Sequence, residues 1–320
     1  MEKNTPTPRQ RDQESLRRLC GPVLLQCLDD PLTQELMLNP DGTLWHERFG
    51  MDMVPVGTIH PSDAEGILRM VAGCLDKVIT WDHPQLDGEF PLDGSRFSGA
   101  LPPIVSGPMF AIRKPASRVF SLEEYVTQGS MAEAQKDVLC QAIEERKNIL
   151  VVGGTSSGKT TFANALIAQM VLQAPHRRHL IIEDLREIQC TARNVIFFHT
   201  TAEVPMFLCL KQGLRLRPDL IHVGEVRDES ALDLLDAWNT GHEGGIATVH
   251  ANSARLGLSR LRGLISRNKY APNHIEEIIG EAVHRIVFIA KTLEGRRIKE
   301  IIAVDGYSHA KQDYLARNIG

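Results

Sequence analysis

A glycine-rich segment near the middle of the chain constrains the fold more than any other feature of the sequence. It lies between the apolar run 148–152 and the helical pattern 160–172. Three glycines, three small hydroxyl residues and one lysine separate the two. Glycine loses more conformational freedom on folding than any other residue, so packing alone does not favour such a segment. We therefore expect a buried strand, a loop with a binding role and a helix, in that order.

The segment matches G-x-x-x-x-G-K-[ST], the pattern of the phosphate-binding P-loop. Its glycines let backbone N–H groups point at an anion, and the following helix adds the positive end of its dipole. The lysine reaches the β- and γ-phosphates, and the last hydroxyl is a ligand for Mg²⁺. No NKxD-type guanine motif occurs, so the sequence predicts ATP rather than GTP, together with Mg²⁺. The predicted nucleotide-binding residues are Gly153, Gly154, Thr155, Ser156, Ser157, Gly158, Lys159, Thr160 and Thr161.

Composition sets the class of protein. Hydrophobic content of 42% and charge of 24% are typical of a globular chain. The net charge of -4 gives no overall basic signature, so non-specific nucleic-acid binding is not implied, although a local basic face is not excluded. The six cysteines include no CxxC pair, which indicates reduced thiols rather than disulfides or a zinc site. Without a signal peptide or an apolar run of about 18 residues, we expect a soluble cytoplasmic protein that could dock on a membrane complex.

Strand-like and helical runs alternate over residues 131–320, which predicts an α/β domain. Such alternation implies a mostly parallel sheet covered by helices; the family resemblance described below implies that this sheet belongs to a RecA-like P-loop domain. We expect the tail after Val304 to be loosely held. After the P-loop the strand-like runs are 179–182, 195–198, 220–223 and 245–250.

Residues 1–115 predict a smaller α+β N-terminal domain. Two strand-like runs surround the turn 39–42, as in a β-hairpin. Residues 62–65 read Ser-Asp-Ala-Glu, a capping box that predicts a helix to about residue 78. Residues 116–130 are expected to form a linker between the two domains.

Acidic and histidine residues follow several of the predicted strands. Glu183 and Asp184 come after one strand, Glu225 after another, and His242 and His250 surround a glycine turn. The carboxyl ends of parallel strands are where an open α/β sheet holds its ligand. Acids there suit Mg²⁺ coordination through water and polarisation of an attacking water.

Each of these residues also has an ordinary structural interpretation. The acids could be a solvated strand end, and Glu225 could simply form a salt bridge with Arg227. The two histidines could be structural residues, since their spacing is not that of a typical metal pair. Arg215 and Arg217 are either intersubunit phosphate contacts or ordinary surface charge.

Four ordered motifs together resemble a known superfamily. The P-loop, IED-x-x-E, R-x-RPD-x-I-x-VGEVRD and GH-x-G-x-x-x-T-x-HANS are similar to those of the secretion-superfamily (traffic) ATPases. That superfamily powers type IV secretion, type II secretion and type IV pili. The chain length and the stretch GSRFSGALPP…FAIRKP resemble the conjugative branch, the TrbB-type transfer ATPases of plasmid mating systems. The resemblance covers roughly residues 90–290.

The resemblance implies roles for individual residues. Residues 182–187 match the family's Asp box, in which Glu183 resembles the characteristic acid near Mg²⁺. Glu225 matches the Walker B glutamate, the expected water-activating base. Gly224 stands where a standard Walker B strand ends in Asp, so the water-mediated Mg²⁺ contact is expected from Glu183 or Asp184.

The remaining implied site residues come from two other motifs. His242 and His250 lie in the His box and would sense the γ-phosphate. Arg96 and Arg113 match a pair of arginines that reaches the phosphates from the other domain, where guanidinium groups offset developing charge. The expected catalytic residues are Glu225, Glu183, Arg96, Arg113 and His250, and the expected metal-site residues are Thr160 and Asp184.

The implied function is that of a ring-forming ATPase, a homohexamer that powers a conjugative type IV secretion apparatus. Its expected partners are inner-membrane components of a mating channel, at the inner face of the cytoplasmic membrane, without clear sequence-specific nucleic-acid binding. The alternatives are a type II secretion or type IV pilus motor, a P-loop kinase, and a scaffold that uses ATP only to assemble. A DNA helicase is less favoured, because no basic, aromatic-rich strand-binding stretch is evident.

Overall fold

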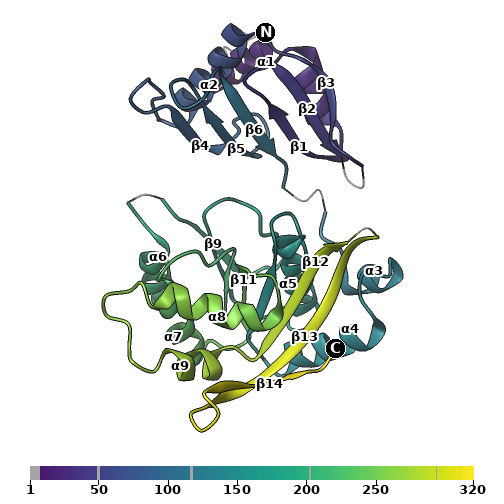
Figure 1. The fold of residues 1–320 in the computed structure, drawn as a ribbon, viewed down its shortest axis with the longest axis vertical. Coiled ribbons are helices and arrows are strands. Elements are labelled where there is room, and N and C mark those ends of the chain that lie inside the picture. The colour runs from purple at the N-terminus through teal and green to yellow at the C-terminus, as the bar shows by residue number, and fades with distance from the viewer. Residues whose placement is uncertain (1–7, 49–50, 116–117, 202, 293) are drawn as a thin grey trace, which may run out of the picture. The chain divides into compact units, whose positions relative to one another are not determined.

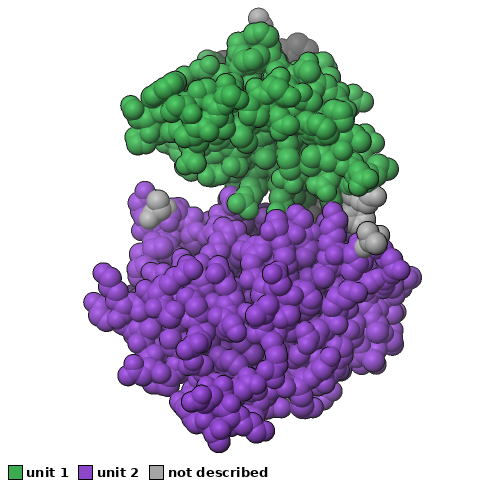
Figure 2. Space-filling model, viewed as in Figure 1, with its two compact units in different colours: residues 1–117 green, residues 118–320 purple. Residues whose placement is uncertain are grey.

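The computed structural model describes residues 8–48, 51–115, 118–201, 203–292 and 294–320 (Figure 1). The chain divides into unit 1, residues 1–117, and unit 2, residues 118–320 (Figure 2). Within the described ranges, no helix combines the length and the apolar character needed to span a membrane.

Unit 1 is an antiparallel sheet with two helices packed on one face (Figure 1). The strand order is β3-β2-β1-β6-β5-β4. Helices α1 (Pro8–Asp29) and α2 (Pro61–Cys74) pack against inward-facing side chains such as Phe97, which is fully buried. The strands are β1 (Thr33–Leu38), β2 (Thr43–Arg48), β3 (Val54–Thr58), β4 (Gln85–Glu89), β5 (Arg96–Ala100) and β6 (Met109–Arg113).

The hairpin predicted around residues 39–42 is present as β1 and β2. Gly42 adopts a φ of 84°, and a Cβ there would lie 2.8 Å from the carbonyl oxygen of Ile59. The predicted capping box at residues 62–65 is wrong. His60 caps α2, and Pro61 occupies the first helical position, where the fixed φ of proline favours the start of a helix.

Unit 2 is built on an eight-stranded sheet of order β14-β13-β12-β7-β11-β10-β8-β9. The six strands from β12 to β9 are parallel, and β13 and β14 extend the sheet in antiparallel fashion. The predicted α/β architecture is confirmed. The strands are β7 (Ile149–Gly153), β8 (His179–Glu183), β9 (Val195–His199), β10 (Leu220–Val223), β11 (Ile246–His250), β12 (Arg285–Thr292), β13 (Gly295–Ser308) and β14 (Asp313–Asn318).

Helices cover both faces of this sheet. Three of them, α3 to α5, share one apolar cluster with the sheet, and α6 to α9 share the other. The central strand β7 is buried along its whole length, as a parallel strand between two helical layers must be. The helices are α3 (Leu122–Thr127), α4 (Glu133–Glu144), α5 (Lys159–Gln173), α6 (Met206–Gly213), the short 3-10 helix η1 (Leu214–Leu216), α7 (Ala231–Asn239), α8 (Ala254–Ile265) and α9 (Ile275–Ala282).

The segment 118–130, expected to be part of a linker, belongs to unit 2. Leu122 and Tyr125 of α3 are buried, and the Tyr125 ring contacts Phe162 edge-on at a centroid distance of 5.1 Å. Strand β13 also holds this segment, because the Ile298 N–H donates to the Ser130 carbonyl at 2.8 Å. The neighbouring Arg297 guanidinium donates to the Gly129 carbonyl.

The expectation that the tail after Val304 is loosely held is wrong. Strand β13 continues to Ser308, and β14 pairs back on it as far as Asn318 opposite Ile302. The reason is that backbone hydrogen bonds to β13 hold β14 in place, together with Tyr314 and Ala316, which are partly buried against the core.

Candidate active site

The glycine-rich loop connects β7 to α5 and has the backbone that its sequence predicts. Gly158 adopts a φ of 91° at the start of α5. A Cβ on Gly153 would lie 2.4 Å from the Ile289 carbonyl oxygen, so a larger residue would clash there. Thr155 is exposed, whereas Ser157 is buried, and the Arg296 Nε donates to the Ser156 carbonyl at 3.2 Å.

Lys159 is folded back onto its own loop. The side chain is 7% exposed, and its Nζ donates to the Gly154 carbonyl oxygen at 2.9 Å. The same Nζ lies 3.2 Å from the His250 Nδ1, at the end of β11. Because β7 and β11 are parallel neighbours with Gly153 opposite His250, the histidine lies directly beside the loop.

His250 connects Lys159 to Glu225. Its Nε2 lies 3.0 Å from the Glu225 Oε1, while its Nδ1 faces the Lys159 ammonium. An ammonium only donates and a carboxylate only accepts, so we assign a neutral imidazole with the proton on Nε2. Burial and the positive charge of Lys159 both lower the pKa of His250, which agrees with this assignment.

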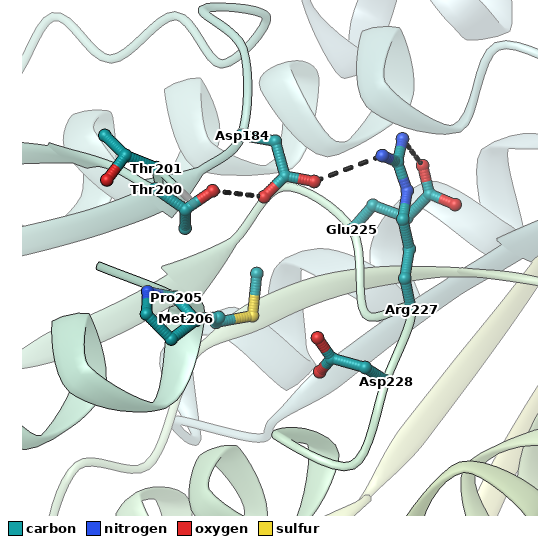
Figure 3. A pocket seen from close by; sticks show the side chains of 8 residues that line it. All are labelled: Asp184, Thr200, Thr201, Pro205, Met206, Glu225, Arg227 and Asp228. Atoms are coloured by element: carbon teal, nitrogen blue, oxygen red, sulfur yellow. Dashed lines mark hydrogen bonds and ion pairs between the residues drawn. The ribbon is translucent and has the colours of Figure 1, made fainter. Parts of the chain in front are cut away.

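Arg227 links Glu225 to Asp184 (Figure 3). Its guanidinium contacts the Glu225 Oε2 at 2.7 Å and the Asp184 Oδ2 at 3.1 Å. The Thr200 hydroxyl donates to the other oxygen of Asp184 at 2.6 Å. Burial raises the pKa of Glu225, but the hydrogen bond and charge of Arg227 lower it more, so the pKa lies below its ordinary value. Glu225 is therefore an ionised carboxylate near neutral pH.

A cavity of about 280 Å³ opens beside these residues (Figure 3). It lies where β8 and β9 end and β10 gives way to the loop before α7. Polar and charged side chains dominate its lining, with apolar contact from Pro205 and Met206. The polar lining residues are Asp184, Thr200, Thr201, Glu225, Arg227 and Asp228.

Glu183 is buried and held by backbone groups. Its Oε2 accepts from the N–H groups of Glu187, at 3.0 Å, and of Ile188, at 2.8 Å. Its Oε1 lies 3.5 Å from the His199 Nε2. Burial raises the pKa of Glu183 to about 7. The carboxylate thus organises the turn after β8.

Glu187 is the acid that the structure brings to Thr160. The Thr160 hydroxyl donates to the Glu187 Oε2 at 3.2 Å, whereas Asp184 is bonded to Thr200 and Arg227. Glu187 lies inside the matched Asp box, but the sequence pattern predicts no site role for it. Its position four residues after Glu183, at the end of the motif, is the signal that could have identified it.

Hydroxyl and carboxylate oxygens are the donors that Mg²⁺ prefers, so Thr160 and Glu187 fit such an ion. The described part of the chain contains no group of three or more His, Cys, Asp or Glu residues arranged to hold a metal by themselves.

Other residues singled out from the sequence lie elsewhere. His242 precedes β11, and Arg215 and Arg217 precede β10, so all three lie at the opposite edge of the parallel sheet from the P-loop. Arg96 and Arg113 belong to unit 1, where they face each other directly on β5 and β6.

Comparison with known proteins gives matches over most of the chain. A family model described as type II/IV secretion system protein matches residues 94–313. The conjugal transfer protein TrbB of Rhizobium radiobacter is 47% identical over 299 residues, covering 93% of this chain and 92% of that protein. The type IV secretion system protein PtlH of Bordetella pertussis is 31% identical over 310 residues, covering 85% and 90%.

Solved structures are similar in fold. The ATPase DotB of Legionella pneumophila gives a TM-score of 0.60 at 16% identity, over 99% of this chain and 82% of that one. The pilus retraction motor PilT with bound ADP gives a TM-score of 0.60 at 20% identity, over 88% and 81%. At these identities the likeness concerns the fold alone.

Proposed function

The chain belongs to the type II/IV secretion system protein family, and from this we propose that it hydrolyses ATP to power a conjugative type IV secretion apparatus. The observation that carries the proposal is a continuous series of polar contacts in unit 2. It runs from the P-loop lysine through His250 and Glu225 to Arg227 and Asp184. Such a series joins the group that would hold the phosphates to the group that would activate water.

Nucleotide binding requires Lys159 to exchange its partners. In the structure its ammonium donates to the Gly154 carbonyl and to His250. The β- and γ-phosphates of ATP would replace both, since a charged oxygen is a stronger acceptor than a carbonyl or an imidazole. The loop N–H groups and the N-terminus of α5 supply the remaining positive potential.

Mg²⁺ would be held through the Thr160 hydroxyl and Glu187, with the phosphates of the nucleotide completing its ligands. When bound, the ion neutralises charge that develops on the phosphoryl oxygens. Asp184 holds Arg227 in place instead, through their ion pair at 3.1 Å.

Glu225 would accept the proton of the attacking water. Its low pKa keeps it ionised, and His250 and Arg227 fix both of its oxygens. Arg96 and Arg113 would add positive charge from unit 1 once that unit closes on the nucleotide. The proposed assembly is a homohexameric ring at the inner face of the cytoplasmic membrane, working with inner-membrane components of a transfer channel.

Phosphate release from ATP without an added acceptor tests the proposal. We expect steady release by the wild type and none by Lys159→Ala at an unchanged melting temperature. Glu225→Gln should keep nucleotide binding and lose at least about 100-fold in turnover, as is typical when a general base is removed. A scaffold would release no phosphate, and a kinase would need an acceptor. Either result would reject the proposal.

A further inference from the structure

Six arginines surround the starts of three neighbouring strands of unit 2, at the edge of the sheet opposite the P-loop. The strands are β10, β8 and β9, whose first residues Leu220, His179 and Val195 lie in register. We call this group the arginine cluster: Arg146, Arg177, Arg178, Arg193, Arg215 and Arg217.

Two members of the arginine cluster are fixed by hydrogen bonds to the chain around them. Arg178 donates from Nε to the Leu216 carbonyl at 3.0 Å and from its guanidinium to the Asn194 Oδ1 at 2.6 Å. Arg146 donates to the carbonyl oxygens of Asp219, at 3.0 Å, and Glu243, at 3.1 Å. These bonds join the segments that precede all three strands into one surface.

The other four guanidinium groups of the arginine cluster have no hydrogen bond or ion pair with any residue that the structure describes. Three of these residues, Arg193, Arg215 and Arg217, are exposed. Burial and the neighbouring Arg146 lower the pKa of Arg177, whereas Asp219 raises it.

Arginines outnumber carboxylates in this group. The segments 174–178, 191–194 and 214–219 contain a single carboxylate, that of Asp219, and the segments around Arg146 add those of Glu144, Glu145 and Glu243. The Asp219 Oδ2 already accepts the backbone N–H of Arg178 at 2.7 Å. The carbonyl ends of α5 and of α6 with η1 add only about half a negative charge each. The surface is therefore positive within a chain whose net charge is -4.

Two members of the arginine cluster also have an unfavourable backbone. Arg146 has a φ of 55° and Arg217 a φ of 52°, in the left-handed region that side chains other than glycine rarely adopt. Both residues end a helix, Arg146 after α4 and Arg217 after η1, which is where a left-handed residue commonly occurs.

We propose that the arginine cluster is a docking site for a segment of a partner protein rich in Asp and Glu. Guanidinium groups bind carboxylates through two parallel hydrogen bonds, and four guanidinium groups of the cluster make no bond to the described chain. Three strands span about 10 Å, the width of one extended peptide or one helix rather than of a bilayer surface. The three segments contain no aromatic residue on which bases of single-stranded nucleic acid could stack.

A labelled oligoglutamate peptide provides the test, with binding to the full chain measured by fluorescence anisotropy. The test variant is Arg193→Gln with Arg177→Gln, because neither guanidinium makes a bond to the described chain and neither residue is a candidate for phosphate contact. We expect the peptide to bind the wild type, more weakly as salt is added, and the variant to bind about tenfold more weakly. Phosphate release from ATP should stay at the wild-type rate, because the cluster lies at the far edge from the P-loop.

A matched control removes two charges elsewhere. Arg267 and Lys269 follow α8 and are exposed, so Arg267→Gln with Lys269→Gln should leave peptide affinity unchanged. Equal binding of the peptide by wild type and test variant, at matching melting temperatures, would overturn the proposal. The proposal would also be rejected by tighter binding of another probe, either vesicles of anionic phospholipid or a single-stranded oligonucleotide. That probe would have to bind the wild type more tightly than the peptide does, and bind the test variant more weakly than the wild type.

Discussion

At the residue scale, His250 is defined by the two groups on either side of its ring. The Lys159 ammonium at Nδ1 and the Glu225 carboxylate at Nε2 leave room for one neutral tautomer only. Arg227 and Arg260 add further positive charge nearby. Once Lys159 moves to a phosphate, the ring keeps its carboxylate, loses its ammonium and gains a negative neighbour. Its pKa should therefore rise when nucleotide binds.

We accordingly expect ATP binding to be coupled to proton uptake near neutral pH. Titration calorimetry in two buffers with different ionisation enthalpies measures the number of protons taken up. His250→Gln should remove this uptake, because an amide can donate to Glu225 and accept from Lys159 but does not titrate.

The same variant supplies the baseline for protons that ATP itself takes up or releases. His242→Gln is the matched control, since His242 lies at the other edge of the sheet, and it should behave as the wild type. Identical proton uptake by wild type and His250→Gln would contradict the proposed exchange of partners by Lys159.

At the scale of the element, β8 and β10 carry a buried histidine pair. The Ile246 N–H donates to the His222 Nδ1, so the proton of His222 is on Nε2, which lies 3.0 Å from the His179 Nδ1. His179 must then carry its own proton on Nε2, an atom without a hydrogen-bond partner in the described chain. Burial and nearby positive charge lower the pKa of His179 to about 4, and burial also lowers that of His222.

This pair should make the fold sensitive to acid. As the pH falls, His179 of the unfolded chain binds a proton near its ordinary pKa of 6.5, whereas folded His179 binds one only at about 4. The contribution of this histidine to stability is therefore fully present above pH 6.5 and is lost as the pH falls from 6.5 to about 4. For His179 the shift corresponds to about 3 kcal/mol. Denaturant unfolding at a series of pH values measures the loss.

His179→Gln, whose amide oxygen can accept the same hydrogen bond, should lose less stability over this pH range than the wild type. If the wild-type free energy of unfolding stayed constant from pH 6.5 to 4, the pair would have no such effect.

Elements with a strong local pattern were predictable, and elements held by distant partners were not. The strand, glycine loop and helix around Lys159 follow from residues next to one another in sequence. Strand β14 did not, because its apolar run of Tyr314, Leu315 and Ala316 is too short to indicate a strand, and its pairing with β13 is through the backbone. In the site, Glu187 was missed for a related reason: only the turn held by buried Glu183 brings it to Thr160.

At the scale of the whole molecule, the proposed site divides between the two units. The P-loop and Glu225 are in unit 2, and Arg96 and Arg113 are in unit 1. A head-to-tail contact between identical chains closes into a ring when its rotation allows, and in a ring neighbouring sites can depend on each other. We expect mixtures of wild type and Lys159→Ala to lose ATPase activity more steeply than the mutant fraction increases.

Subunits must be mixed at a constant total concentration and allowed to exchange, with sedimentation in ATP reporting the assembly. Glu65→Gln serves as the control subunit, which is mixed with the wild type in place of Lys159→Ala. The Glu65 carboxylate is exposed and pairs only with Arg69 in the described chain. A strictly proportional loss of activity, with monomers in sedimentation, would exclude the ring.

The start of β13 has a mechanical consequence. Its consecutive residues Arg296 and Arg297 contact the Ser156 carbonyl in the P-loop and the Gly129 carbonyl near the start of unit 2. The hairpin of β12 and β13 thus links the nucleotide loop to the segment through which the chain enters from unit 1. We expect a load applied to that segment to reach the loop through β13, a strand of the sheet. The stiffness of β12 and β13 would then determine how much force is transmitted. We expect the backbone amide hydrogens of these two strands to exchange with solvent more slowly when bound nucleotide orders the P-loop.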